Sequence, residues 1–288
     1  MINKNNLNFI FFGTDEFAVF VLLELKEKGL IPKLIVTNPD RHQGRHLTLT
    51  PSPVKSWALK EKIEFIQPEN LTPEEIKGKY PQLIQPETEL FLVASYGKIL
   101  PLYLINLPTK GTLNIHPSLL PKYRGPSPIT TPILAGDKIS GVTIMQVDEK
   151  MDHGPILIQK EINIENKNYA ILESEFAKMG VELLATILSA WLENNLIPKT
   201  QDHQQASFTK KITKIDGLIN MADKPLVNYR KFLALNSKSG VYFFLKNKGR
   251  EIRIKITAAH MTDSKFIIDK VIPAGKQEML WSDFCRNI

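Results

Sequence analysis

Three polar side chains in the sequence could carry out chemistry together: a carboxamide, an imidazole and a carboxylate. Asn114 and His116 stand two residues apart in "TLNIHPSLLPKYRGPSPI", and Asp152 stands in "EKMDHGPIL". A carboxamide N–H can hold the oxygen that becomes negative in a tetrahedral intermediate, and a histidine can donate to that oxygen or move a proton. A carboxylate can accept the proton of an attacking amine or orient the imidazole. These residue types suit acyl transfer without a covalent enzyme intermediate.

The loop that follows His116 is rich in proline, with Pro117, Pro121, Pro126 and Pro128 within a dozen residues. Proline fixes φ and lowers the freedom of the unfolded chain, so a rigid loop is expected. Donors that are already in place need no reorganisation when an oxyanion forms. A purely structural role stays open for each polar residue, because Asn, His and Asp are also frequent in turns and at strand ends.

Other kinds of chemistry have less support in the sequence. No Ser or Cys is placed as an obvious nucleophile, and the G-x-S-x-G pattern is absent. The segment "FFGTDEFA" has a single glycine, so it is not a dinucleotide-binding fingerprint, and no P-loop pattern occurs. The histidines show no metal-ligand spacing beyond the pair His42 and His46, and a lone Cys285 makes neither a disulfide nor a cysteine metal site. We expect no metal.

The elements that position these side chains alternate between strand and helix. Apolar runs predict strands at 7–12, 33–37, 89–95, 111–115, 141–147 and 156–164, and helical spacing predicts helices at 17–28, 54–62 and 169–193. This alternation indicates an α/β fold with a doubly wound, mostly parallel sheet, in which ligands bind beyond the carboxyl ends of the strands. The strand at 111–115 places Asn114 and His116 at that edge. If the strands on either side of Asp152 are neighbours, their turn can meet His116 there.

Composition divides the chain into three parts. Residues 1–195 carry the α/β pattern, the polar and glutamine-rich stretch 196–208 predicts a linker, and residues 209–288 look like a small β-rich domain. Residues 203–288 contain 16 Lys and Arg against 7 Asp and Glu, a net +9, whereas the rest of the chain has a net charge of −2. Such a basic segment attracts nucleic acid through phosphates, although a solvated lysine-rich surface is the alternative.

The sequence has no apolar run near the roughly 20 residues that span a bilayer. Its first residues, "MINKNNLNFIFFG", lack the features of a signal or transit peptide. We expect a cytoplasmic monomer that does not associate with membranes.

Several motifs resemble one family. The segment "TLNIHPSLLPKYRGPSPI" is similar to the signature of the 10-formyltetrahydrofolate-dependent formyltransferases, and "GVTIMQVDEKMDHGPIL" resembles their second block. "FFGTDEFA", "NPDRHQGRHLTLTPSPVK" and "IPAGKQEMLWSDFCR" are similar to segments of the methionyl-tRNA formyltransferases within this family. The blocks follow in the right order over nearly the whole chain. The resemblance implies a Rossmann-like formyltransferase domain and an OB-like C-terminal domain that is shorter than usual.

The resemblance also implies an activity, transfer of the formyl group of 10-formyltetrahydrofolate to the α-amino group of methionyl initiator tRNA for translation initiation. Asn114 would polarise the formyl carbonyl, His116 would assist by charge and proton transfer, and Asp152 would accept the proton of the amine. The folate site would be lined by Tyr96, Gly97, Ser118, Leu119, Leu120 and Pro121. The tRNA would be bound by Arg41, Arg45, Lys210, Lys211, Lys214, Lys246, Lys248, Arg250 and Arg253.

Rival interpretations keep parts of this pattern. A sugar-nucleotide amine N-formyltransferase would use the same folate donor, but the basic C-terminal segment and the "PDRHQGR" loop argue against it. A glycinamide ribonucleotide formyltransferase would need no second domain. A non-catalytic tRNA-binding relative would need none of Asn114, His116 and Asp152, and all three are present.

Overall fold

The computed structural model describes residues 7–43, 47–247 and 249–286, which form two compact units. The first unit contains Met1–Pro126, Gly141–Glu161 and Glu173–Phe208, and the second contains Ser127–Ser140, Ile162–Leu172 and Thr209–Ile288. The second unit therefore gathers three separate segments of the chain. The domain division at 195 and 208 that composition suggests stays a prediction.

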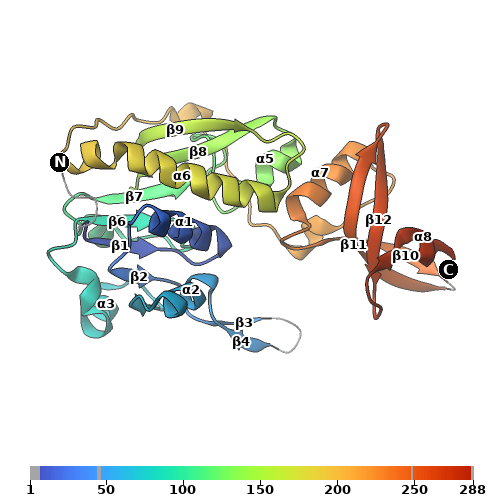
Figure 1. Ribbon diagram of the computed structural model, residues 1–288, viewed down its shortest axis with the longest axis horizontal. Helices are drawn as coiled ribbons and strands as arrows, with labels where there is room; N and C mark the ends of the chain where they lie inside the picture. The colour runs from blue at the N-terminus through green and yellow to red at the C-terminus, as the bar shows by residue number, and fades with distance from the viewer. Residues whose placement is uncertain (1–6, 44–46, 248, 287–288) are drawn as a thin grey trace. The chain divides into compact units, whose positions relative to one another are not determined.

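A seven-stranded sheet forms the centre of the first unit (Figure 1). Its order is β5-β2-β1-β6-β7-β8-β9, and the first five strands in this order pair in parallel, whereas β8 is antiparallel to β7. This confirms the predicted α/β fold with a mostly parallel sheet. The strands are β1 (Phe9–Phe12), β2 (Leu34–Val36), β5 (Phe65–Ile66), β6 (Leu90–Val93), β7 (Thr112–His116), β8 (Ile139–Gln146) and β9 (Ile156–Asn163).

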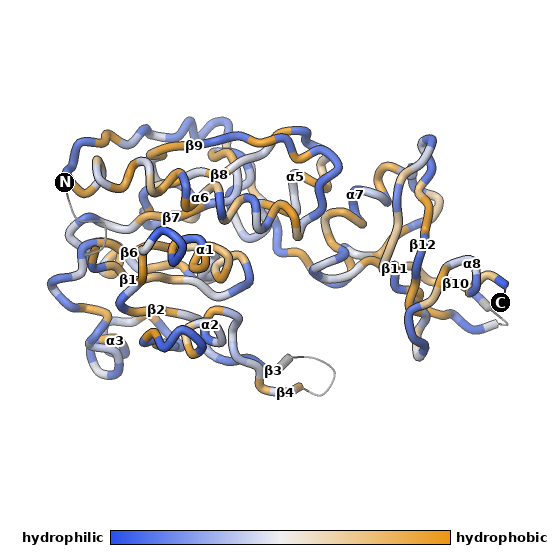
Figure 2. Tube along the Cα trace, in the orientation of Figure 1, coloured by the Kyte–Doolittle hydropathy of each residue, from blue (hydrophilic) through white to orange (hydrophobic). Residues whose placement is uncertain are grey.

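The central strands are continuous apolar runs because both faces of a parallel sheet are covered. All residues of β1 and β2 are buried, and Figure 2 colours β1, β2 and β6 as hydrophobic. On one side of these strands, Phe12 packs against Phe91 with 5.0 Å between ring centroids and against the edge of Tyr96 at 5.4 Å.

The predicted helices are confirmed to within one residue at each end. They are α1 (Glu16–Glu27), α2 (Pro53–Glu61) and α6 (Tyr169–Leu192). Two further short helices, α3 (Pro73–Lys79) and α4 (Leu102–Ile105), lie between α2 and α6 in the sequence. The starts follow from local chemistry: the Asp15 carboxylate accepts from the Ala18 N–H, and Ser52 caps α2 directly before a proline at the first helical position. Within the described ranges, no helix combines the length and the apolar character needed to cross a membrane.

Helix α6 packs closely against β7 and β8. A Cβ added at Gly180 would lie 2.4 Å from Ile115 Cγ2 and 3.3 Å from Val142 Cγ1, so α6 covers the sheet face that carries Ile115. Successive side chains of a strand point to opposite faces. Asn114 and His116 therefore project from the other face of the sheet, away from α6.

A short hairpin lies in the segment that sequence patterning leaves without an element. Strands β3 (Arg41–Gln43) and β4 (Thr48–Thr50) pair in antiparallel register, with Arg41 opposite Thr50. Each strand spans only three residues, which is too short for an alternating pattern to be recognised.

The second unit confirms the expected small β-rich part of the chain. Its sheet contains β10 (Val241–Asn247), β11 (Arg250–Thr262), β12 (Lys265–Pro273) and β13 (Met279–Leu280) in chain order, and its helices are α5 (Thr130–Ala135), α7 (Pro225–Leu235) and α8 (Trp281–Arg286). The described sheet thus has four antiparallel strands, whereas an OB barrel has five. Helix α5 contacts α7, and the Arg230 guanidinium donates to the Ala135 carbonyl at 3.4 Å.

Candidate active site

Asn114 and His116 lie at the carboxyl end of β7, as the sequence predicts. Asn114 is opposite Val93 of the parallel neighbour β6 and Met145 of the antiparallel neighbour β8. Because β6 and β7 are parallel, the loops that follow them leave the same edge of the sheet. Asn114 and His116 are two residues apart in one strand, so their side chains share a face.

Asp152 reaches this face by a route that differs from the sequence expectation. Since β8 is antiparallel to β7, its last residue, Gln146, lies opposite Leu113, at the far end of β7 from His116. The connection from β8 to β9 must therefore turn back along the sheet. Asp152 adopts a left-handed backbone conformation, with φ of 51°, and Gly154 passes so close to β8 that an added Cβ would lie 2.0 Å from the Gln146 carbonyl oxygen.

The structure brings the imidazole and the carboxylate together. His116 Nδ1 lies 3.6 Å from Asp152 Oδ1, slightly beyond a direct hydrogen bond, and catalytic contacts of this kind often tighten when substrate binds. His116 Nε2 lies 3.2 Å from the Tyr123 carbonyl oxygen, which can only accept, so Nε2 carries a proton. Asp152 Oδ2 accepts from the Gly125 N–H at 2.7 Å. The side chain of His116 is 5% exposed and that of Asp152 is 14% exposed, so the carboxylate is the more accessible group.

The carboxamide of Asn114 is half-buried on the same face. Across the part of the chain that the structure describes, it has no hydrogen-bond partner. Its N–H groups are therefore free to donate to an oxygen of a bound molecule. A free amide donor beside a histidine–carboxylate pair can stabilise a developing oxyanion and take up a proton.

The proline-rich loop after His116 is tied to the two strands beside it. The Ser118 hydroxyl donates to the Lys122 carbonyl at 2.8 Å, and the Thr143 hydroxyl of β8 donates to the Ser118 carbonyl at 2.6 Å. Gln159 of β9 donates to the Leu120 carbonyl at 2.8 Å and to Thr143 Oγ1 at 2.7 Å. These bonds fix the loop in addition to its prolines.

The same loop contributes a buried arginine that sequence analysis did not single out. Arg124 is 3% exposed, and its Nη2 donates to Gln201 Oε1 at 2.6 Å and lies 2.9 Å from His203 Nδ1. Burial lowers the pKa of the Arg124 guanidinium, and the negative charge of Asp152 opposes that shift.

The segment 196–208, for which composition predicts a linker, runs against the site. Lys199 pairs with Ile156 as an isolated antiparallel bridge, and Phe208 pairs with Arg124. Between these bridges, Gln201 Nε2 donates to the Asp152 carbonyl at 3.0 Å and to the Gly154 carbonyl at 2.7 Å. Nothing in the polar composition of this stretch marks Gln201 as different from its neighbours.

Comparisons with known proteins agree with this geometry. A family model described as "Formyl transferase" matches residues 5–188. A methionyl-tRNA formyltransferase of Syntrophomonas wolfei is 34% identical over 94% of this chain and 85% of its own, and one of Chloroflexus aggregans is 38% identical over 90% and 82%. The chain belongs to the formyl transferase family. The resemblance seen in the sequence motifs is thereby confirmed.

Solved structures show that the fold itself is shared by formyl transferases with different acceptors. An N-formyltransferase from Helicobacter canadensis in complex with folinic acid and dTDP-3-aminofucose superimposes with a TM-score of 0.61 at 18% identity, covering 91% of this chain and 95% of its own. A methionyl-tRNA formyltransferase from Clostridium thermocellum gives 0.60 at 16% identity, covering 93% and 98%. At these identities the structural likeness supports the fold and does not choose the acceptor.

The residues expected to line the folate site of this formyl transferase differ in what they expose. Ser118 and Leu120 are buried, and Ser118 is already bonded, through its hydroxyl to the Lys122 carbonyl of the loop and through its carbonyl to the Thr143 hydroxyl of β8. Leu119 and Pro121 are half-buried and keep side-chain surface available. Of these four residues, Leu119 and Pro121 therefore supply the accessible apolar surface.

Tyr96 and Gly97 follow β6 at the same sheet edge. Tyr96 is a core residue, because its ring is buried against Phe12 and this burial raises the pKa of its hydroxyl. Its carbonyl accepts from Thr14 Oγ1 at 2.8 Å and from Asn38 Nδ2 at 2.7 Å, which fixes the loop. Gly97 is exposed, with φ of 82°, and leaves open main chain at this edge.

The candidate tRNA contacts are scattered over the formyl transferase chain. Arg41 lies exposed in β3, 3.5 Å from the Glu69 carboxylate. Lys210 is exposed and donates to Asp216 at 2.7 Å, whereas Lys211 and Lys214 are exposed near it in sequence. Arg45 and Lys248 lie outside the described residues.

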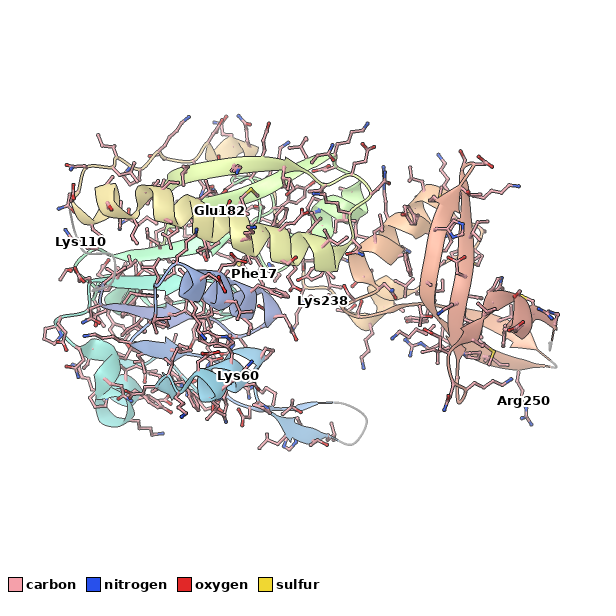
Figure 3. The ribbon with its side chains drawn as sticks, in the orientation of Figure 1. Phe17, Lys60, Lys110, Glu182, Lys238 and Arg250 are labelled. Atoms are coloured by element: carbon pink, nitrogen blue, oxygen red, sulfur yellow. The ribbon has the colours of Figure 1, made fainter. Side chains whose placement is uncertain are left out.

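In the second unit, the outer face of β10 and β11 carries both basic and aromatic side chains. Phe244 is opposite Arg253 and Lys246 is opposite Glu251, so these side chains share one face, together with Lys255, which sequence analysis did not include. Phe244 is 47% exposed, and the Arg253 guanidinium stacks 3.9 Å from the centre of the Tyr242 ring. Figure 3 shows Arg250 projecting from the end of β11.

The described residues contain no group of three or more His, Cys, Asp or Glu side chains that could hold a metal ion.

Proposed function

We propose that this protein transfers the formyl group of 10-formyltetrahydrofolate to the α-amino group of methionyl initiator tRNA, giving formylmethionyl-tRNA for translation initiation. The chemistry is supported by one observation above the others: His116 Nδ1 lies 3.6 Å from Asp152 Oδ1, beside the free carboxamide of Asn114. The choice of acceptor is supported by relatives named methionyl-tRNA formyltransferase, which are 34–38% identical over 90–94% of this chain.

The proposed reaction needs only a modest base. An α-amine has a pKa of about 7.7–8.0, so a useful fraction is neutral at pH 7 and can attack the formyl carbon directly. A C–N bond to the methionine amine forms, and the carbonyl oxygen becomes negative and accepts a hydrogen bond from Asn114. Asp152 takes the proton of the amine. The bond between the formyl carbon and N10 then breaks, and N10 leaves with a proton.

His116 and Asp152 act as a pair in this proposal. The Tyr123 carbonyl holds the ring of His116 through Nε2 and leaves Nδ1 directed at Asp152. The Gly125 N–H holds the second oxygen of Asp152, so the carboxylate keeps one oxygen for proton transfer. A proton accepted from the amine can pass between carboxylate and imidazole on its way to the departing N10.

The folate donor would bind beside this pair. Leu119 and Pro121 offer apolar surface on the loop after β7, and Gly97 offers exposed main chain on the loop after β6. Tyr96 and Ser118 would support the site by fixing these loops, because their polar groups are already bonded or buried.

Residues 209–288 would bind the tRNA. The shared face of Lys246, Arg253 and Lys255 can neutralise phosphates, and the exposed ring of Phe244 offers a surface on which a base can stack. Lys210, Lys211, Lys214, Arg250 and the β3 residue Arg41 would add phosphate contacts. We further propose that the protein acts as a cytoplasmic monomer.

The proposal is tested by incubating the purified protein with 10-formyltetrahydrofolate and charged initiator tRNA and detecting blocked methionine. Elongator methionyl-tRNA and UDP-amino sugars serve as comparison acceptors, and formylation of the sugar alone would overturn the assignment. Replacing Asn114 or Asp152 by Ala is expected to lower kcat by at least about 10²-fold. Asn195→Ala, at an exposed position after α6, is the matched control and should leave kcat unchanged.

A further inference from the structure

We infer that Gln201 is a positioning residue for Asp152, acting from the segment 196–208. Gln201 is 4% exposed and touches neither Asn114 nor His116 by a hydrogen bond. Its amide group bonds the main chain on both sides of His153, at the carbonyls of Asp152 and Gly154. This inference rests on the proposed function, because it assigns a role to Asp152 in proton transfer.

The orientation of the Gln201 amide is fixed by its partners. Nε2 faces two carbonyl oxygens, which only accept, and Oε1 faces the guanidinium of Arg124, which only donates. A flipped amide would set oxygen against oxygen and nitrogen against nitrogen. Both N–H groups and the carbonyl of the side chain are therefore committed to this one arrangement.

Gln201 and Arg124 hold Asp152 from two directions. The guanidinium of Arg124 donates to the Gln201 amide oxygen, and the Gln201 amide nitrogen donates to the Asp152 carbonyl. Gly125, the residue after Arg124, donates its N–H to the Asp152 carboxylate. Hydrogen bonds thus hold both the main chain of Asp152, through Gln201, and its side chain, through Gly125, to the loop that follows His116. Asp152 is in the left-handed region, which is uncommon for residues other than glycine, although aspartate is among those enriched there.

Loss of the Gln201 amide would free the turn that carries Asp152. The buried Gly154 carbonyl and the partly buried Asp152 carbonyl would lose their donor, and the turn would move to recover partners. A displacement of about 1 Å at a catalytic group costs up to about 10²-fold in rate. Gln201→Met, which keeps the length of the side chain, is expected to lower kcat by about 10–10²-fold, with KM for folate and tRNA changed by less than about threefold.

The test is a double-mutant cycle with Asp152→Asn. If Gln201 acts through the Asp152 carboxylate, Gln201→Met lowers kcat in the wild-type background and has almost no further effect in the Asp152→Asn background. The same fold loss in both backgrounds, or no loss in the wild type, overturns the inference. Thr112→Val is the matched control, because it removes another buried donor, to the Ile105 carbonyl at 2.8 Å, and should leave kcat unchanged.

Two further measurements keep the outcome decisive. Gln201→Glu keeps an acceptor for Arg124 while losing both donors, so it should show the same loss of kcat even if Gln201→Met does not fold. Hydrogen exchange of the Gly125 amide reports the Asp152 contact without any activity, and faster exchange in Gln201→Met than in Thr112→Val is expected. If the wild type formylates no acceptor, the proposed function fails, and equal exchange in the two variants then overturns the positioning role separately.

Discussion

Gly154→Ala should disable the site by moving Asp152, although residue 154 takes no part in the chemistry. An added Cβ would lie 2.0 Å from the Gln146 carbonyl oxygen, and ordinary van der Waals contact begins at 3.4 Å, so the turn must move by more than 1 Å. The Gln146 oxygen is a main-chain atom and the added Cβ is bonded directly to the main chain of residue 154. No flexible side chain can therefore move aside to relieve the clash. Asp152 is two residues away and already lies 3.6 Å from His116. A shift of this size is expected to lower kcat by about 10²-fold.

The assay is the steady-state formylation of methionyl-tRNA at saturating folate, together with thermal unfolding. Overpacking of this kind costs about 1–3 kcal/mol, which a folded domain can tolerate, so the variant should be folded and slow. Gly78→Ala is the matched control: it lies inside α3 with no atom within 4 Å of the added Cβ, and it should gain about 0.5–1 kcal/mol with unchanged kcat. A folded Gly154→Ala enzyme with kcat within about twofold of wild type would refute the reasoning.

Three other substitutions test separate features. The Tyr96 hydroxyl is buried without a partner in the described part of the chain, so Tyr96→Phe should leave the free energy of unfolding in urea unchanged or raise it by up to about 1 kcal/mol; a clear loss would contradict this. The hydrogen bonds that Asp216 accepts from Lys210 and from Thr213 lower its pKa to about 2. The ionised Asp216 carboxylate therefore stabilises the fold fully above the unfolded pKa near 3.8, and this stabilisation is lost as pH falls through 2. Asp216→Asn should therefore have a lower Tm than wild type at pH 7 and an equal Tm near pH 2. An equal Tm at pH 7 would show that the hydrogen bonds of Asp216 do not stabilise the fold. Arg253→Ala should weaken tRNA binding and reduce its salt slope by about 1, with kcat unchanged at saturating tRNA; an unaltered slope would exclude a phosphate contact.

The sequence predicts the elements of the fold well where burial is complete. Strands such as β1 and β6 are short apolar runs between turn residues, and α6 is long enough for its helical spacing to be unmistakable. The position of His116 at a strand end follows from the same pattern. The direction of β8 does not, because a buried apolar run has the same composition in parallel and antiparallel pairing.

Side-chain roles that depend on tertiary contacts were harder to predict. Tyr96 follows a strand at the ligand edge, which is typical of a site residue, yet its ring lies in the core. Gln201 stands in a polar stretch, and its hydrogen bonds exist only because the chain returns to Asp152 after α6. Local composition contains no information about such a return.

The second unit takes in residues 127–140 and 162–172 as well as the C-terminal segment. Helix α5 buries Ile133 and contacts α7, so its partner is encoded nearly a hundred residues downstream. A protein truncated after Phe208 would lack α7, so the surface of α5 that contacts α7 would be exposed and the product would be prone to aggregate. A C-terminal segment exchanged from another protein would therefore have to present an α7 that still packs against α5.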